Sequence, residues 1–161
     1  MASRPSGVNA KSLDQLYSRP GFLLRRAHQI AVGIFVTECA GVGLTPPQHG
    51  VLIAVEKRPG LNQAELARLL GFDRATVGQV VEGLELRGLL RRTSSAHDRR
   101  NKSLALTPRG ETRMRRAARA IQRTSERLLS PFTRGERELF IELLERLTGE
   151  LNQESRTPLR K

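Results

Sequence analysis

Two short helical segments, each with its own N-terminal capping signal, lie two residues apart in the middle of the chain. Residues 62–65 (Asn-Gln-Ala-Glu) have the spacing of a capping box, in which the first and last side chains satisfy free backbone amides at a helix start. Gly71 is expected to end this helix, and Asp73 caps a second one, predicted over residues 74–87 from its helical periodicity. Two short capped helices at this separation are typical of a helix-turn-helix.

A pair of predicted β-strands follows the second helix. Residues 89–93 and 102–107 have the composition of strands, and residues 95–101 between them are polar and charged, as expected of a hairpin tip. A helix-turn-helix that continues into such a hairpin is a winged helix. The sequence therefore predicts a mainly α protein in which a small β-hairpin, the wing, follows a helix-turn-helix.

Helical periodicity predicts further helices on both sides of this unit. One runs from residue 13 or 21 to about Cys39, and another begins at the capping residue Thr45. Two more follow the wing, and the last carries an apolar stripe too wide for an isolated surface helix. All of them are expected to belong to one structural domain, with residues 1–12 forming a flexible arm and residues 153–161 a frayed tail.

Positive charge is concentrated in one quarter of the chain. The whole sequence has 28 Lys and Arg against 16 Asp and Glu, and the stretch from Arg87 to Arg127 alone has 13 basic and three acidic residues. Such a block is the electrostatic footprint expected of a surface that binds phosphates. The alternative is the arginine bias of a GC-rich genome, which accounts for the preference over lysine but not for the clustering.

The remaining composition excludes several classes of protein. A single cysteine, Cys39, excludes an internal disulfide framework and a cysteine-based zinc cluster. No apolar run approaches the ~20 residues of a membrane span and no secretory signal is recognisable, so we expect a cytoplasmic protein without a membrane partner. The histidines, His28, His49 and His97, lack metal-ligand spacing, and neither a glycine-rich phosphate loop nor a nucleophile–base pair is found. We therefore expect neither an enzyme nor a bound metal or cofactor.

Four stretches carry the most specific pattern in the sequence, namely residues 72–77, 84–92, 98–102 and 106–110. Within the third stretch, Asp98, Arg100 and Lys102 are spaced two residues apart. These stretches resemble the MarR family of bacterial transcription regulators, whose wing has the pattern Asp, any residue, Arg, any residue, Lys or Arg. The similarity extends over roughly residues 22–151.

The resemblance implies an assembly and a function that the residues do not show by themselves. It implies a homodimer whose α-helical dimerisation region consists of the first helix (residues 13–44) and the last helices (residues 108–152), around a winged helix-turn-helix at residues 45–107. It also implies a palindromic operator in double-stranded DNA and, often, a small ligand that releases the DNA. The expected function is that of a ligand-responsive transcriptional regulator, most often a repressor. The alternative is an architectural or constitutive DNA-binding protein without an effector.

The helix that follows Asp73 is the expected recognition helix, whose N-terminal residues meet the major groove. Arg74 has the donors to bind guanine or a phosphate, and Gln79 is long enough to reach the edge of an adenine. Thr76 is expected to bind a phosphate. The alternative for each of these residues is a solvated surface side chain without a DNA contact.

Four charged residues are expected to act in the wing. Asp98 can form a bidentate ion pair with Arg100, which would hold the arginine side chain in place before DNA binds. An arginine positioned at a hairpin tip suits the narrow, electronegative minor groove. Arg99 and Lys102 are expected to contact backbone phosphates. The alternative is a simple surface ion pair that contributes little energy.

In the family that the sequence resembles, ligands lie between the dimerisation region and the winged helix. The candidate residues are Arg25, Arg26 and His28 on the first helix and His49 on the second. Arg25 and His28 are three residues apart and can share a helix face as an anion-binding pair, or they can make structural or interface hydrogen bonds instead. Residues 19–30 also resemble members that control the breakdown of aromatic acids, some of which respond to hydroxycinnamoyl-CoA thioesters. An aromatic acid or its CoA thioester is therefore the expected effector.

Cys39 raises a second regulatory possibility, because some members of the family sense peroxides through a cysteine. Those sensors place the reactive cysteine near the start of the first helix, whereas Cys39 lies near its end. The chain also lacks a second cysteine that would resolve an oxidised form within one chain. A buried, unreactive Cys39 is therefore favoured over a cysteine-based redox-sensing regulator.

Overall fold

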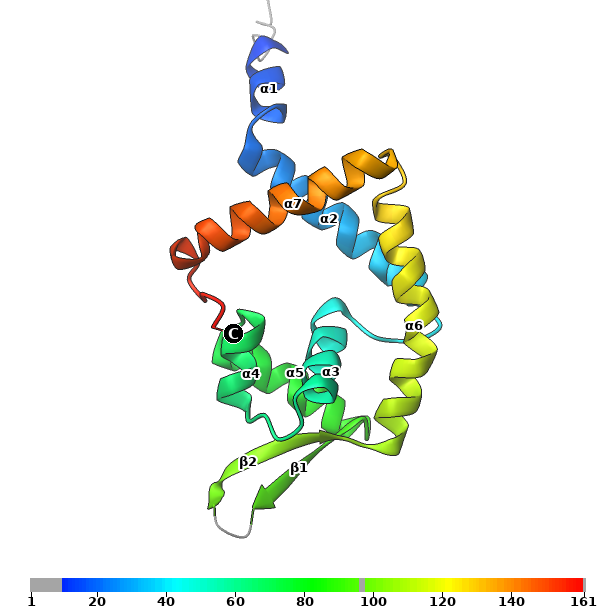
Figure 1. Ribbon diagram of the computed structural model, residues 1–161, viewed down its shortest axis with the longest axis vertical. Helices are drawn as coiled ribbons and strands as arrows, with labels where there is room; N and C mark the ends of the chain where they lie inside the picture. The colour runs from blue at the N-terminus through cyan, green and yellow to red at the C-terminus, as the bar shows by residue number, and fades with distance from the viewer. Residues whose placement is uncertain (1–9, 96–97, 161) are drawn as a thin grey trace, which may run out of the picture.

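The computed structural model describes the backbone of residues 10–95 and 98–160 and the side chains of residues 13–93 and 102–160. These residues form seven α-helices, one short 3-10 helix and one antiparallel hairpin (Figure 1). In chain order the elements are α1 (Ala10–Tyr17), α2 (Pro20–Glu38), α3 (Pro46–Lys57), α4 (Gln63–Leu70), α5 (Arg74–Leu86), β1 (Leu90–Ser95), β2 (Asp98–Leu106), α6 (Pro108–Leu128), α7 (Arg134–Glu150) and η1 (Asn152–Glu154).

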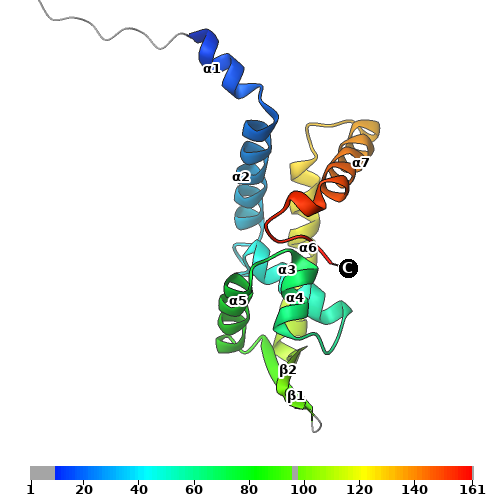
Figure 2. The same cartoon turned by 90° about the vertical axis from the view of Figure 1, so that its left-hand side faces the viewer.

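The elements are distributed between the two ends of the molecule. Helices α3, α4 and α5 lie together above the β1–β2 hairpin at one end, and α1, α2 and α7 lie at the other end (Figure 1). Helix α6 runs from the base of the hairpin towards the α7 end, a path that the view turned by 90° also shows (Figure 2). This arrangement is a winged helix-turn-helix with flanking helices, so the predicted fold class is confirmed.

The helix-turn-helix is formed by α4 and α5, and both helices start at their predicted caps. The Asn62 side chain accepts the Glu65 amide at 2.9 Å, and the Glu65 carboxylate accepts the Asn62 amide at 2.9 Å. Gly71 ends α4 with a φ of 64°, a left-handed conformation that residues with a Cβ rarely adopt. Asp73 then accepts the Thr76 amide at 2.8 Å and begins α5. Caps of this kind each stabilise a helix by about 1 kcal/mol.

The hydrophobic core lies inside the winged helix-turn-helix, where α3, α4 and α5 meet the hairpin. Burying one of its leucine side chains contributes about 1.5–3 kcal/mol. Helix α7, by contrast, has no buried residue. The largest fully buried side chains in this unit are Leu52, Leu66, Leu84, Leu89, Leu104, Val51, Val55, Val77 and Val81.

The strands of the wing are longer than the sequence predicted. Leu90 pairs with Leu106 at the base of the hairpin, and most of residues 95–101, predicted as the tip, belong to strands. Cross-strand polar contacts accompany this pairing, since the hydroxyls of Thr93 and Ser103 lie 2.7 Å apart. Both predicted strands stopped short of the hairpin tip, because the polar stretch between them was interpreted as a loop. Polar side chains can also pair across strands.

Both described chain ends differ from the prediction. Helix α1 begins at Ala10, so residues 10–12 of the predicted flexible arm (1–12) are helical, and residues 1–9 lie outside the described residues. The single predicted N-terminal helix is two helices, because Pro20 begins α2 at a position that favours proline. Of the predicted frayed tail (153–161), the described residues 153–160 instead contact α4 and the turn after it through hydrogen bonds that the sequence pattern does not reveal, and residue 161 lies outside the described residues.

Helix α6 is joined to α2 by both charge and packing. Glu38, the last residue of α2, accepts hydrogen bonds from Arg123 at 2.9 Å and from Arg127 at 3.2 Å. These two hydrogen bonds hold the pKa of Glu38 below its usual value. Ala117 and Ala120 of α6 are buried in the same core cluster as the helix-turn-helix residues. Helix α6 therefore connects the core unit to the α2 end of the molecule.

Within residues 10–95 and 98–160, no helix combines the length and the apolar character that crossing a membrane requires.

Candidate DNA-binding surface and effector site

Helix α5 has one face in the core and one face in solvent. Val77, Val81 and Leu84 are buried, and Arg74 and Gln79 are exposed. A recognition helix needs this division, because its inner face must pack while its outer face enters the major groove. The structure therefore places the two predicted base-reading residues where DNA can reach them.

Thr76 is engaged within the cap of α5. Its hydroxyl donates to the Asp73 carboxylate at 2.6 Å, and these hydrogen bonds from Thr76 hold the pKa of Asp73 below its usual value. A hydroxyl has one proton, so Thr76 cannot donate to a phosphate while it donates to Asp73. The phosphate contact expected of Thr76 therefore requires this hydrogen bond to break.

The predicted wing residues are only partly described. Lys102 is exposed on β2, opposite Ser94 in the strand pairing. The backbone of Asp98, Arg99 and Arg100 belongs to β2, but their side chains lie outside the described residues. The ion pair between Asp98 and Arg100 therefore stays a prediction.

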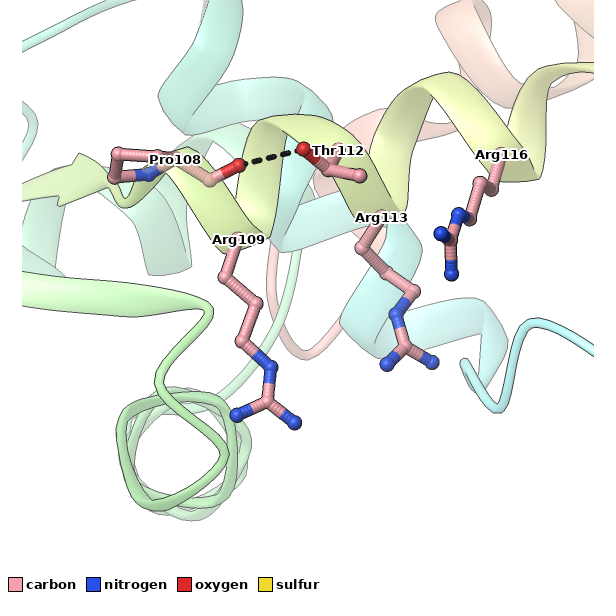
Figure 3. Close-up of a pocket in the computed structure, with 5 residues that line it drawn as sticks. All are labelled: Pro108, Arg109, Thr112, Arg113 and Arg116. Carbon is pink, nitrogen blue, oxygen red and sulfur yellow. Dashed lines mark hydrogen bonds between the residues drawn. The ribbon is translucent and has the colours of Figure 1, made fainter.

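A second basic patch, which was not among the predicted sites, lies at the start of α6. Arg109, Arg113 and Arg116, with Pro108 and Thr112, line an open hollow of about 530 Å³ (Figure 3). Among the described residues, none of these arginines forms an ion pair with a carboxylate. Their spacing of four and three residues was the available signal, because it places side chains on one helix face.

Uncharged oxygen atoms accept hydrogen bonds from two guanidinium groups, one in this patch and one near it. Arg113 donates to the Val42 carbonyl, and Arg87 donates to the Gly43 carbonyl at 2.6 Å and to the Gln48 side chain at 3.1 Å. These acceptors orient the guanidinium groups without cancelling their charge. The patch therefore keeps a positive potential that attracts DNA or an anionic ligand.

The four predicted ligand residues have three different surroundings in the single chain. Arg25 and Arg26 are exposed on α2, and both donate to the Gln29 side chain, at 3.3 Å and 3.0 Å. The Arg25 guanidinium also lies 4.9 Å from the ring centre of Phe22. An arginine beside an aromatic ring suits an aromatic anion, but His28 and His49 take no part in this cluster.

The two candidate histidines have mainly apolar neighbours. His28 lines a hollow of about 520 Å³ between α2, α6 and α7, whose other walls are apolar. His49 on α3 is half-buried, with its ring centre 5.9 Å from that of Phe35. Burial lowers the pKa of His49, which favours the neutral ring near neutral pH.

Helices α1, α2 and α7 expose many large apolar side chains. Soluble monomers rarely expose large apolar patches, and such patches mark surfaces that bind a partner. We name the set of these exposed side chains the apolar face. Its exposed members are Leu13, Leu16, Tyr17, Leu23, Leu24, Ile30, Val36, Leu139, Ile141, Leu143, Leu147 and Leu151.

Cys39 is buried at the end of α2, with 2% of its surface exposed. Burial raises the pKa of the Cys39 thiol and so disfavours the thiolate that reacts with oxidants. This environment favours the structural role over the redox role. Among the described residues, no group of three or more His, Cys, Asp and Glu residues is arranged to hold a metal ion.

Known proteins are similar in sequence to the winged helix-turn-helix of this chain. The family model described as the MarR family matches residues 42–101, from the loop before α3 into β2. A protein of Thauera aromatica, described as a putative transcriptional regulatory protein for the hcr operon, is 36% identical over 143 residues, covering 86% of this chain and 82% of that protein. The chain belongs to the MarR family.

Solved structures of similar regulators share the fold of this MarR-family chain. The repressor CouR bound to a 23-mer DNA duplex has a TM-score of 0.79 and 34% identity, covering 84% of this chain and 96% of that one. CouR from Rhodococcus jostii RHA1 bound to p-coumaroyl-CoA has a TM-score of 0.70 and 27% identity, covering 82% and 93%. The PcaV regulator from Streptomyces coelicolor, in complex with its natural ligand, has a TM-score of 0.74 and 31% identity, covering 92% and 98%. The chain is thus a DNA-binding transcriptional regulator and not an enzyme.

Proposed function

We propose that this MarR-family protein is a homodimeric repressor that binds a palindromic operator and releases it when a small anionic effector binds. One chain has both a recognition helix whose polar face is exposed to solvent and a large solvent-exposed apolar face. This combination carries the proposal. The polar face binds DNA and the apolar face binds a second copy. Because its partner is chromosomal DNA, we place the protein in the cytoplasm.

A second copy of the chain is the partner that suits the apolar face. A two-fold dimer buries the same patch on both subunits, so one apolar surface covers the other. The two-fold axis also relates the two α5 helices, and each helix then reads one half-site. The operator of such a dimer is a palindrome.

The proposed DNA contacts divide between the two grooves. Arg74 and Gln79 on α5 enter the major groove, where Gln79 reaches a base edge and Arg74 binds guanine or a phosphate, and the wing residues 98–102 enter the minor groove or bind phosphates. An ion pair of 3.2 Å between Arg92 of β1 and Glu85 of α5 supports the proposal, because it ties the wing to the recognition helix. Both elements can therefore bind one duplex together.

Replacing Arg100 by alanine tests the wing. We expect Arg100→Ala to weaken operator binding more than about tenfold, because a minor-groove arginine contributes both charge and hydrogen bonds. Fluorescence anisotropy with an operator selected from a random duplex library gives the affinity, and thermal melting checks the fold. Arg134→Ala on α7, which removes the same charge far from the wing, is the control. Unchanged affinity of Arg100→Ala at physiological salt would contradict the wing assignment.

We further propose that the effector is an aromatic acid or its CoA thioester, bound near Arg25, Arg26, His28 and His49. The Arg25 guanidinium beside the Phe22 ring supports this choice. The similar structure of CouR with bound p-coumaroyl-CoA supports it as well. Because these residues do not converge in a single chain, the second copy is expected to complete the site. Binding there would then change the separation of the two recognition helices.

Replacing Arg25 or His28 by alanine tests the effector site. We expect either change to abolish the release of operator by p-coumarate or p-coumaroyl-CoA, with unchanged affinity for the operator alone. The wild-type protein should also melt about 5 °C higher with saturating ligand, since a ligand that binds only the folded state stabilises it. Arg134→Ala is again the control. Normal release in both variants would exclude this site, and no response of the wild-type protein to either compound would favour an effector-independent DNA-binding protein.

A further inference from the structure

The C-terminal segment, residues 152–160, leaves the end of α7 and returns to the helix-turn-helix (Figures 1 and 2). The Asn152 side chain donates to the Leu159 carbonyl at 3.1 Å and accepts the Leu159 amide at 2.9 Å. These two bonds close the segment into a loop. Leu159 stays near the end of α7, where it lines a hollow with Thr148 and Gly149, and the next residue, Arg160, lies beside α4.

The end of α4 supplies acceptors that hold this segment. The last turn of a helix leaves carbonyl groups without donors inside the helix. The Arg160 amide donates to the Arg68 carbonyl at 3.0 Å, and the Thr157 hydroxyl donates to the Gly71 carbonyl at 2.6 Å. The segment thus satisfies carbonyl groups at the turn that leads into the recognition helix.

Close packing accompanies these hydrogen bonds. A Cβ at Gly71 would lie 3.1 Å from the Leu159 side chain and 3.1 Å from the Thr157 carbonyl oxygen, closer than most real Cβ contacts. The same glycine has the left-handed φ that ends α4. The turn and the segment therefore pack closely, and a larger residue at position 71 would have to push the segment away by a few tenths of an ångström.

Three arginines from three different elements meet at this contact. Arg68 of α4, Arg74 of α5 and Arg160 of the segment line a hollow of about 270 Å³. The Asp73 carboxylate also lines it, but accepts two hydrogen bonds from Thr76. Among the described residues, no ion pair includes any of the three arginines. The hollow therefore has a net positive charge beside the N-terminus of α5, where the helix dipole adds to it.

From this arrangement we infer that the C-terminal segment is part of the DNA-binding surface, and that Arg160 binds a backbone phosphate together with Arg68 and Arg74. The inference rests on the proposed insertion of α5 into the major groove. Phosphates line that groove, and arginine binds them with two parallel hydrogen bonds. Because the Arg160 backbone is already hydrogen-bonded to α4, less conformational freedom is lost when its side chain binds.

The test compares two arginines of the same segment in the full-length protein. Arg156→Ala removes one exposed charge at a residue that does not line the hollow, and Arg160→Ala removes one that does. Both are titrated with a fluorescein-labelled random-sequence duplex of about 30 base pairs, because phosphate contacts do not depend on sequence. Relative to Arg156→Ala, we expect Arg160→Ala to bind several-fold more weakly. We also expect its slope of log affinity against log salt to be smaller in magnitude by about 0.9, because one phosphate is no longer neutralised.

The outcomes separate this inference from the proposed function. Arg160→Lys, which keeps the charge, is expected to retain most of the wild-type slope. Equal slopes for the Arg156 and Arg160 alanine variants would overturn the inference, and so would tighter binding by Arg160→Ala, which would show that the segment covers the surface. If the wild-type protein binds no duplex at all, the proposed function fails as well.

Discussion

Replacing Gly110 with alanine is expected to destabilise the folded protein by about 3 kcal/mol or more. Gly110 lies in the first turn of α6, where a Cβ would be 2.1 Å from the Leu89 carbonyl oxygen. That oxygen cannot easily move away, because it accepts the Thr107 amide at 3.2 Å and Leu89 is fully buried. The alanine therefore forces α6 away from the base of the wing. Thermal unfolding followed by circular dichroism should show a Tm lower by roughly 6 °C or more.

The control for this variant is a glycine in the middle of another helix. An added Cβ at Gly83 of α5 has no atom within 4 Å, and alanine is favoured over glycine inside a helix by about 1 kcal/mol. Gly83→Ala should therefore have an unchanged or slightly higher Tm. A Gly110→Ala protein that melts with the wild type would contradict the close approach of α6 to Leu89.

Replacing Leu147 with glutamate is expected to convert the proposed dimer into monomers and to lower operator affinity about 100-fold or more. Leu147 lines the apolar hollow between α2, α6 and α7 and is 41% exposed in the single chain, so a monomer tolerates a charge there. In the dimer the same carboxylate would be buried without a partner against apolar side chains of the second copy. A monomer also loses the simultaneous binding of two half-sites. Analytical ultracentrifugation measures the first effect, and fluorescence anisotropy with the selected operator measures the second.

The same substitution at an exposed leucine outside the apolar face provides the control. Leu86 is 83% exposed at the end of α5, in the half of the molecule opposite α7 (Figure 1). Leu86→Glu should leave the oligomeric state unchanged. If the Leu147→Glu protein remained dimeric, α7 would not belong to the interface. If the wild-type protein were monomeric, the proposed dimer itself would be excluded.

The helix-turn-helix could be predicted because its signals act over a few residues. The caps at Thr45, Asn62 and Asp73 each bind an amide three positions along the chain, and Gly71 acts through its own backbone conformation. The stretches that resemble the MarR family are equally contiguous, and the family is confirmed. The hairpin of the wing was predicted, but its strands were predicted too short, because a polar strand and a polar loop have similar compositions.

The candidate sites were harder to predict because they combine residues from different elements. Arg25 and His28 were grouped by their spacing, yet Arg25 contacts Phe22 and Gln29 whereas His28 lies in an apolar hollow. The basic patch at the start of α6 was visible in the sequence only as charge and as the spacing of its arginines. The orientation of Arg113 in this patch, and of Arg87 near it, depends on carbonyl groups in the loop before α3. Backbone carbonyls contribute nothing to a hydropathy or charge pattern.

The two short capped helices, the hairpin after them, the basic charge and the family could therefore be inferred from the sequence alone. Each depends on composition or on neighbours within about one helical turn. The position of the C-terminal segment, and the arginines that it brings together, became visible only in the folded chain. Thr157 donates to the carbonyl of Gly71, 86 residues away, and no local pattern specifies that contact, because it depends on how the intervening helices pack.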